Sequence, residues 1–306
     1  MEYSLKYIHY RLKGDIGEFI GECEQNYQRQ INFVAEQIAA SNRQKPIVLL
    51  NGPSSSGKTT TCDRLYRALS KHGIHAKMVS MDDYYRSHGT YDIPEDPENH
   101  VPDLECPECM NLPLLSHHLA ALVAGEEIAM PRFDFTVRKS IPNAQIVRLH
   151  PDEVILIEGI HAFNPVIMGD LANAAIGVYL SIASTVQPEE GQRMEAYMLR
   201  FLRRAMRDSL FRSTEVKDTL RQWLSVRRGE RLYIGPYRGQ ADFTIDTFLP
   251  YELNVLAEHL RPQLENLQEQ LQQADLEPVV EIMPQIMTIP YAEYIPENSV
   301  LHEFIG

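Results

Sequence analysis

The most chemically informative stretch of this sequence is Gly-Pro-Ser-Ser-Ser-Gly-Lys-Thr at residues 52–59. Its glycines let the backbone curl until successive N–H groups face a single anion. A helix that begins at the end of the loop would add the partial positive charge of its N-terminus. Lys58 would then reach the β- and γ-phosphates of a nucleotide, and the Thr59 hydroxyl would bind Mg²⁺. The residues expected to bind the nucleotide are Gly52, Pro53, Ser54, Ser55, Ser56, Gly57, Lys58, Thr59 and Thr60.

Acidic residues follow two further strands that the sequence predicts. Asp82 comes after the strand Ala76–Met81, and Glu158 comes after the buried run Val154–Ile157. Ligands of an open parallel sheet bind at the carboxyl ends of its strands. Asp82 could accept a hydroxyl proton, orient the nucleophile and contact Mg²⁺, with Glu158 as a second acid beside the metal. We expect Asp83, in contrast, to cap a helix.

Arginines recur at three- and four-residue spacing between Arg200 and Arg207, which places them on one face of a helix. In an acidic protein with a phosphate-binding loop, such a stripe favours a lid that neutralises a phosphoryl group during its transfer. We expect Arg207 and Arg212 to belong to this lid. For Arg200 and Arg203 a solvated helix surface explains the spacing equally well.

The elements that must position these residues alternate between strands and helices. The phosphate loop lies between a buried parallel strand, Ile47–Leu50, and a helix, Thr60–Leu69. We further expect helices at Asp15–Ala40, Leu114–Ala124, Glu189–Asp208, Glu215–Arg227 and Tyr251–Ala274, strands at Ile176–Ile182 and Phe243–Ile245, a long loop at 86–113 and an irregular proline-containing tail.

This alternation predicts an α/β fold, a doubly wound parallel sheet of the P-loop NTPase type with a helical lid at about 200–217 and flanking N- and C-terminal helices. The expected organisation is an N-terminal helical segment (1–44), a kinase domain (45–255) and a C-terminal helix with its tail (256–306). The N-terminal helix is expected to pack on the core, and an oligomerisation helix, which would make a homo-oligomer, is the alternative.

Composition restricts the functional class. The chain has 306 residues, 44% of them hydrophobic, and a net charge of −13, which argues against a nucleic-acid binder. It contains no apolar run long enough for a membrane span, and its first residues do not resemble a signal peptide, so we expect a cytoplasmic protein that binds no membrane. Cys106 and Cys109 form a single C-x-x-C pair, which we interpret as two reduced thiols in a loop.

Taken in order, several segments resemble the uridine kinase and phosphoribulokinase family. They are Gly52–Thr60, Ser80–Tyr85, Pro131–Phe135, Ile157–Ile160 and Arg203–Asp208. The resemblance runs from about residue 45 to 255 and is strongest to bacterial uridine kinase-like nucleoside kinases. The segment Val226–Glu230 and the ending Ile295–Gly306 also resemble that group. Longer members of that group carry an N-terminal portion related to threonyl-tRNA synthetase, which is not recognisable in this sequence. The resemblance implies ATP- and Mg²⁺-dependent phosphorylation of a nucleoside 5′-hydroxyl.

The same resemblance implies roles for individual residues. The aspartate matching Asp82 is the proposed base, and the acid matching Glu158 lies beside Mg²⁺ together with the hydroxyl matching Thr59. The acid matching Glu105 binds the ribose hydroxyls. The other residues implied on the substrate or phosphate side are Tyr85, Phe133, Phe135, Arg138, Arg204, Arg207 and Arg212.

Three of these positions depart from the uridine kinase pattern. Glu105 replaces an aspartate, Phe133 replaces a tyrosine, and a base-reading histidine is replaced near Arg138. Hydrogen-bonding groups supply most discrimination between similar substrates, so the sequence does not determine which alcohol accepts the phosphoryl group. One alternative to a nucleoside kinase is a kinase for a sugar phosphate or another small alcohol, for which the further cations would be Arg132, Arg138 and Lys139. The other alternative is a nucleotide-binding regulatory module with little turnover.

Overall fold

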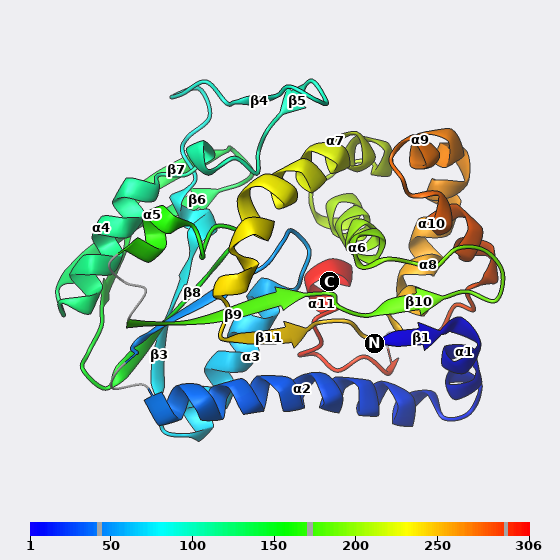
Figure 1. Ribbon diagram of the computed structural model, residues 1–306, viewed down its shortest axis with the longest axis horizontal. Helices are drawn as coiled ribbons and strands as arrows, with labels where there is room; N and C mark the ends of the chain where they lie inside the picture. The colour runs from blue at the N-terminus through cyan, green and yellow to red at the C-terminus, as the bar shows by residue number, and fades with distance from the viewer. Residues whose placement is uncertain (42–44, 170–173, 291–292) are drawn as a thin grey trace.

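A computed structural model describes residues 1–41, 45–169, 174–290 and 293–306 (Figure 1). Its centre is a five-stranded sheet with the order β11-β9-β2-β8-β3, in which all neighbouring strands run parallel. These strands are β2 (Ile47–Asn51), β3 (His75–Ser80), β8 (Glu153–Gly159), β9 (Ala175–Ser181) and β11 (Phe243–Asp246). The parallel α/β sheet expected from the sequence is confirmed.

Alternate residues of β2 enter two hydrophobic cores, one on each face of the sheet. Val48 and Leu50 share a core with α2 (Ile16–Ser41) and α3 (Lys58–Lys71). Ile47 and Leu49 belong to a second core with α4 (Leu112–Val123). Because both faces are covered, β2 is apolar at successive positions instead of alternating with polar residues.

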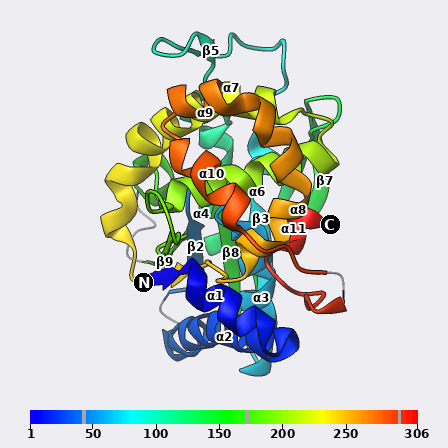
Figure 2. The same ribbon diagram turned by 90° about the vertical axis from the view of Figure 1, so that its right-hand side faces the viewer.

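Further strand pairs form separate two-stranded sheets outside this central sheet (Figures 1 and 2). A short strand, β1 (Glu2–Ser4), pairs with β10 (Thr185–Gln187), and two antiparallel pairs are β4 (Glu95–Asp96) with β5 (Val101–Pro102) and β6 (Glu127–Asp134) with β7 (Lys139–Arg148). The other helices are α1 (Leu5–Lys13), α5 (Pro165–Met168), α6 (Ala196–Phe211), α7 (Val216–Gly229), α8 (Glu252–Leu264), α9 (Gln268–Gln273), α10 (Glu277–Ile282) and α11 (His302–Ile305).

The N-terminal helix α2 packs along α3, the helix that follows the phosphate loop (Figure 1). Glu24 of α2 accepts a hydrogen bond from Arg64 of α3 at 2.6 Å, and both side chains are buried. The hydroxyl of Tyr27 pairs with that of Thr61. The apolar face of α2 is buried as expected, while the expected segment boundary at residue 44 lies outside the described residues.

Two expected helices differ from the structure. The helix expected at Glu189–Asp208 begins only at Ala196, because Val186 bridges to Met194 and Gly191 adopts φ +95°, which a helix does not allow. The helix expected at Tyr251–Ala274 is divided into α8 and α9. At Leu267 the backbone leaves helical geometry (φ −118°, ψ 18°).

The segment expected as a long loop at 86–113 includes the short pair β4–β5, a 3-10 turn at Pro107–Cys109 and the start of α4. Cys106 and Cys109 are buried free thiols at that turn, so the interpretation of two reduced thiols agrees with the structure. Among the described residues, no helix combines the length and the hydrophobicity that crossing a bilayer requires.

A fully buried ion pair fixes α6 to α8. Arg203 of α6 and Glu252 of α8 are each 0% exposed, and their charged atoms lie 2.5 Å apart. Arg203 also donates hydrogen bonds to the backbone oxygen and the hydroxyl of Thr247, at 2.7 and 3.2 Å. Arg203 is therefore a structural group of the core and does not belong to a solvated helix face.

We expect Arg203→Met to lower the free energy of unfolding by about 3–5 kcal/mol, because Glu252 would keep a buried charge without its partner. The double variant Arg203→Met/Glu252→Leu should recover part of this loss. Arg221→Ala is the control, since Arg221 is 74% exposed and such a surface change costs about 0.5 kcal/mol or less. Urea unfolding measures all three, and an unchanged midpoint for Arg203→Met would contradict this role.

Candidate active site

The phosphate loop joins β2 to α3, as the sequence predicts. Gly57 precedes α3 with φ +80°, a conformation that glycine adopts without strain. A Cβ atom at Gly57 would lie 2.5 Å from Cγ2 of Val300, and a Cβ atom at Gly52 would lie 2.2 Å from the carbonyl oxygen of Leu180. Both glycines are thus required by close packing, which fixes the loop and the N-terminus of α3 in place.

Basic side chains hold this loop from two directions. Arg200 of α6 donates a hydrogen bond to the backbone oxygen of Ser54 at 3.1 Å, and Arg204 donates to the Ser54 hydroxyl at 2.7 Å. Lys58 Nζ lies within the loop's own curve, 3.1 Å from the backbone oxygen of Pro53. Arg200 is 97% buried and paired with Glu230 at 2.5 Å, so it supports the loop and is not a surface group.

The parallel register brings the acidic strand ends together beside the loop. Glu158 of β8 is the neighbour of Leu50 in β2 on one side and of Ser80 in β3 on the other. The Ser80 hydroxyl donates a hydrogen bond to Glu158 Oε1 at 2.6 Å. Asp82 follows Ser80 in the 3-10 turn Met81–Tyr84 and lines the same cavity as Glu158.

Burial raises the pKa of Glu158 well above its usual value of 4.5, and the nearby charge of Asp82 raises it further. The charge of Lys58 and the hydrogen bond from Ser80 act in the opposite direction. A buried carboxylate with this environment favours a nearby cation, and binding a divalent metal would keep Glu158 ionised.

The donor set suits a magnesium nucleotide. Thr59, Asp82 and Glu158 supply hard oxygen atoms around one cavity, next to Lys58. In the part of the chain that the structure describes, no group of three or more His, Cys, Asp or Glu side chains forms a metal cage. Mg²⁺ in nucleotide sites commonly uses one or two carboxylates together with phosphate oxygens and water, so the arrangement fits that ion.

Three arginines converge on Asp208 at the end of α6. Arg207 contacts an Asp208 oxygen at 2.8 Å, Arg204 at 3.4 Å and Arg212 at 3.6 Å. One buried carboxylate thereby holds three guanidinium groups of like charge close together. Because their charge exceeds that of Asp208, this cluster has the capacity to bind additional anionic oxygens. Arg207 and Arg212, which the sequence predicts beside phosphate, both belong to this cluster, and that role stays a prediction.

An aromatic wall lines another side of the cavity. The rings of Tyr85 and Phe133 lie 5.6 Å apart, and those of Phe133 and Phe135 lie 5.0 Å apart. Phe133 belongs to β6 and Phe135 follows it in the turn to β7, so this hairpin carries part of the wall. The guanidinium of Arg212 lies 5.8 Å from the Phe135 ring centre. Such a surface suits a flat or apolar ligand group.

The expectation that Asp83 caps a helix is wrong. Asp83 lies inside the turn Met81–Tyr84, and its Oδ1 accepts a hydrogen bond from the backbone N–H of Phe133 at 3.0 Å. Asp83 therefore ties the β6–β7 hairpin to the end of β3. This contact joins residues 50 positions apart, which local capping patterns do not predict.

Glu105 lies deep in the cavity and is 93% buried. Its carboxylate is 3.7 Å from Arg204, and its Oε2 is buried with no hydrogen-bond partner among the described residues. Burial raises the pKa of Glu105, while the charge of Arg204 lowers it. A buried oxygen without a hydrogen bond costs folding free energy. Glu105 Oε2 is therefore suited to accept a hydrogen bond from a hydroxyl group of a ligand.

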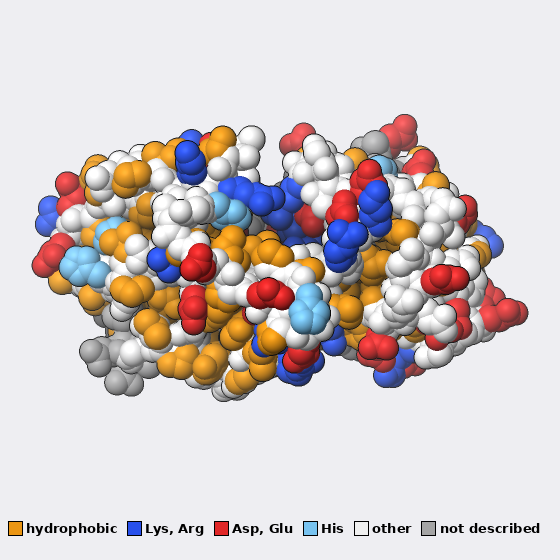
Figure 3. Space-filling model, turned by 90° about the horizontal axis from the view of Figure 1, so that it is seen from above, with side chains coloured by type: hydrophobic (Ala, Val, Ile, Leu, Met, Phe, Trp, Pro, Cys, Tyr) orange, Lys and Arg blue, Asp and Glu red, His pale blue; other side chains and the backbone are white. Residues whose placement is uncertain are grey.

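These groups surround one cavity of about 540 Å³. Figure 3 shows Lys and Arg side chains gathered in a hollow of the face seen there. The expected site residues that line the cavity are Ser54, Ser55, Lys58, Thr59, Asp82, Tyr85, Glu105, Phe133, Phe135, Arg138, Glu158, Arg204, Arg207 and Arg212. Gly52, Pro53, Ser56 and Gly57 shape the loop, and Thr60 lines a neighbouring cavity.

Some cavity residues carried no signal in the sequence. Tyr91 and His88 belong to the segment that we expected as a loop, and Gln222 belongs to α7. Glu303 reaches the cavity from the C-terminal segment, 243 residues after Thr60. No local motif marks His88, Tyr91 or Gln222, because only the tertiary packing brings them to the site.

Comparisons with known proteins bear on the family and the fold. A family model described as the phosphoribulokinase/uridine kinase family matches residues 47–250. A uridine kinase from Bacillus pumilus is 28% identical over 212 residues, which cover 66% of this chain and 87% of that protein. A uridine kinase from Deinococcus deserti is 28% identical over 203 residues with the same shares of both chains.

A solved structure from Silicibacter sp. TM1040, named as a candidate fructose transport system kinase, superposes with a TM-score of 0.51 at 21% identity. It covers 70% of this chain and 98% of its own, a likeness that concerns the fold. The family match covers all five strands of the central sheet, the phosphate loop and α6. The protein is thus a P-loop kinase that belongs to the phosphoribulokinase/uridine kinase family.

Proposed function

We propose that this protein transfers the γ-phosphoryl group of Mg²⁺-bound ATP to a hydroxyl group of a nucleoside, at the 5′ position of its sugar. The observation that carries the proposal is one cavity in which Lys58 and the arginine cluster face Asp82, with the aromatic wall beside them. The family match and relatives named uridine kinase support the same reaction.

Each group has a chemical task in this proposal. Asp82 accepts the proton of the acceptor hydroxyl and orients its oxygen. Lys58, Arg207 and Arg212 stabilise the negative charge on the phosphoryl group as it moves. Mg²⁺, when bound at Thr59 and Glu158 with Asp82 beside it, would neutralise phosphate charge. The lid expected at about 200–217 would limit the access of water to the cavity, which restrains wasteful hydrolysis of ATP.

The acceptor pocket combines the aromatic wall with Glu105. A flat nucleobase would lie against Phe133, Phe135 and Tyr85, and the free oxygen of Glu105 would accept a hydrogen bond from a ribose hydroxyl. Arg204, 3.7 Å from Glu105, would hold that carboxylate in place. Arg138 completes the substrate side from the turn after β6.

A second candidate keeps the phosphoryl transfer and changes the acceptor to a sugar phosphate or another small alcohol. The observation that favours it is the number of cations around the cavity, where Arg138 adds to Arg204, Arg207 and Arg212. The site also lacks a tyrosine hydroxyl at Phe133 that could select a base. A regulatory module that binds nucleotide without transfer is the remaining alternative.

A panel of acceptors with ATP and Mg²⁺ tests the proposal. We expect acceptor-dependent ADP release with uridine or cytidine and little with sugar phosphates. Asp82→Asn should lower kcat by at least about a hundredfold, because the amide cannot take the proton. Asp83→Asn is the matched control, since its amide oxygen still accepts the Phe133 hydrogen bond. Turnover of sugar phosphates alone would favour the second candidate, and equal turnover by Asp82→Asn would exclude Asp82 as the base.

We expect Arg207→Ala to lower kcat by about a hundredfold or more, since it removes a preorganised cation from the phosphoryl group. Arg221→Ala, on the exposed face of α7, is the arginine control. Steady-state kinetics with saturating ATP measures both. If kcat of Arg207→Ala equals that of the unchanged protein, the cluster around Asp208 has no part in the chemical step.

The raised pKa of Glu158 predicts the pH dependence of kcat/KM, which reports the free enzyme. Protonated Glu158 cannot bind Mg²⁺, so activity should fall on acidification already above pH 4.5, where an ordinary glutamate stays ionised. Ser80→Ala removes a hydrogen bond that lowers this pKa and should shift the acidic limb of the profile to higher pH. An identical limb in Ser80→Ala would show that another group titrates.

A further inference from the structure

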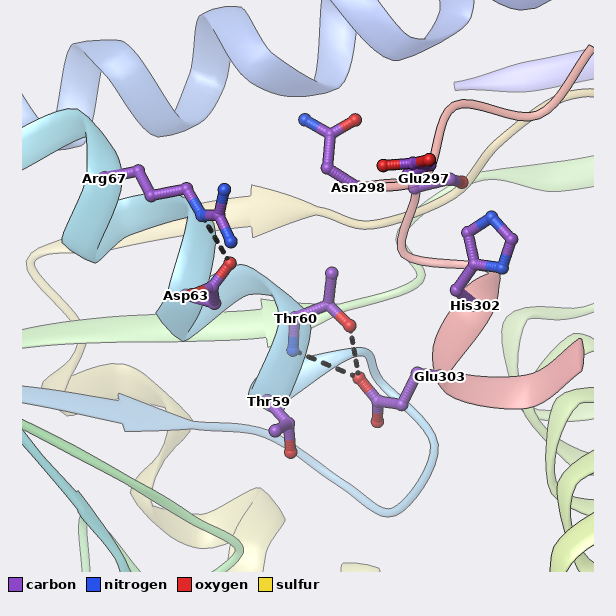
Figure 4. A pocket seen from close by; sticks show the side chains of 9 residues that line it. Thr59, Thr60, Asp63, Arg67, Glu297, Asn298, His302 and Glu303 are labelled. Atoms are coloured by element: carbon purple, nitrogen blue, oxygen red, sulfur yellow. Dashed lines mark hydrogen bonds and ion pairs between the residues drawn. The ribbon is translucent and has the colours of Figure 1, made fainter. Parts of the chain in front are cut away.

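The C-terminal segment 297–306 lies against the N-terminus of α3 (Figure 4). Glu303 of α11 accepts two hydrogen bonds through Oε2, from the backbone N–H of Thr60 at 3.3 Å and from the Thr60 hydroxyl at 3.2 Å. Thr60 belongs to the loop's own sequence and lies in the first turn of α3. A carboxylate of this chain therefore occupies a place where the helix N-terminus favours an anion.

Several contacts dock this segment onto the core. Val300 and Phe304 are fully buried, and the guanidinium of Arg203 lies 5.1 Å from the Phe304 ring centre. Arg64 of α3 donates a hydrogen bond to the backbone oxygen of Asn298 at 2.6 Å. The position of Glu303 is thus set by packing of its neighbours and not by its own hydrogen bonds alone.

A second cavity of about 470 Å³ opens between α3 and this segment. Thr59 and Glu303 line both this cavity and the one that holds Lys58, Asp82 and Glu158. The two cavities therefore adjoin at the start of α3. The other side chains facing the second cavity include Asn298 and His302, and His302 Nε2 is buried with no hydrogen-bond partner among the described residues.

The size and placement of the two cavities suit one extended ligand. A triphosphate whose terminal group lies near Lys58 and Asp82 would follow the loop to the N-terminus of α3. Its nucleoside end would then continue beyond Thr59 into the second cavity. Glu303 lies in that path with a negative charge. The backbone N–H of Thr60 is a single donor, so a phosphate would have to replace the Glu303 carboxylate as the acceptor of its hydrogen bond.

We propose that the segment 297–306 is part of the donor-nucleotide site. The second cavity receives the nucleoside end of the nucleotide, and Glu303 holds the place of a phosphate group on Thr60 until the nucleotide displaces it. This inference rests on the proposed use of ATP. The segment 297–306 itself lies beyond residue 250, where the family match ends. Glu303 thereby acts as an internal competitor that lowers the affinity for the donor.

Calorimetric titration of the full chain with two probes tests this inference: Mg²⁺-bound ATP and Mg²⁺-bound inorganic triphosphate, which lacks a nucleoside. Glu303→Gln should bind both probes about tenfold more tightly, because the competing charge is gone. Glu258→Gln, an exposed position of α8, carries the same change of charge and should bind like the unchanged protein. His302→Ala should weaken the binding of ATP severalfold and leave the binding of triphosphate unaltered. Unaltered triphosphate binding would also show that the phosphate loop of this variant is intact.

Each outcome decides a separate point. Unchanged or weaker binding of both probes by Glu303→Gln would overturn the competition, and weaker binding would make Glu303 a ligand of the bound metal instead. Equal effects of His302→Ala on both probes, or no effect on either, would overturn the placement of the nucleoside. If the unchanged protein and Glu303→Gln both fail to bind either probe, the proposed use of ATP itself fails.

Discussion

The contact between α6 and the phosphate loop is the interaction on which the rest of the site depends. Arg200 and Arg204 donate to the backbone oxygen and the hydroxyl of Ser54, and Arg203 between them is tied to Glu252 and Thr247. A loop rich in glycine and serine has high conformational entropy when free. Charged hydrogen bonds from a buried helix hold it in one shape before any ligand arrives, which lowers the cost of ordering it on binding.

The same helix also delivers charge to the cavity. Residues on successive turns face in similar directions, so the arginines that support the loop are followed by Arg207 and Arg212 at the cavity wall. Asp208 keeps these cations close together and satisfies part of their hydrogen-bonding capacity. One helix therefore sets both the position of the loop and the positive field next to it.

The two sides of the site differ in how they are built. The phosphate side uses strand ends and helix termini of the sheet, where parallel register places Ser80, Glu158 and the loop at one edge. The proposed acceptor side uses a hairpin and irregular segments, held by single contacts such as the Asp83–Phe133 hydrogen bond. Loops and connecting segments tolerate change better than the elements they connect, so kinases of one fold can differ in their acceptors.

The sheet edge that carries the phosphate loop and Glu158 was largely predictable from sequence. The loop spacing, the apolar strands and the acids after Met81 and Ile157 are local patterns with a direct physical meaning, and the parallel sheet follows from their alternation. Local helix periodicity failed where a bridge or a non-helical backbone conformation interrupts the helix. Gly191 and the bridge from Val186 to Met194 delay the start of α6, and the backbone at Leu267 divides the expected C-terminal helix.

What only the tertiary structure decided is which distant groups meet. The stripe spacing placed Arg200, Arg203 and Arg207 on one helix face, but only packing separates them into a loop support, a buried ion pair and a cavity cation. Likewise the sequence alone does not show the partner of Glu303, which meets Thr60 because Val300 and Phe304 are buried in the core. Periodicity reports which residues share a face, whereas the partner of that face depends on contacts hundreds of residues apart.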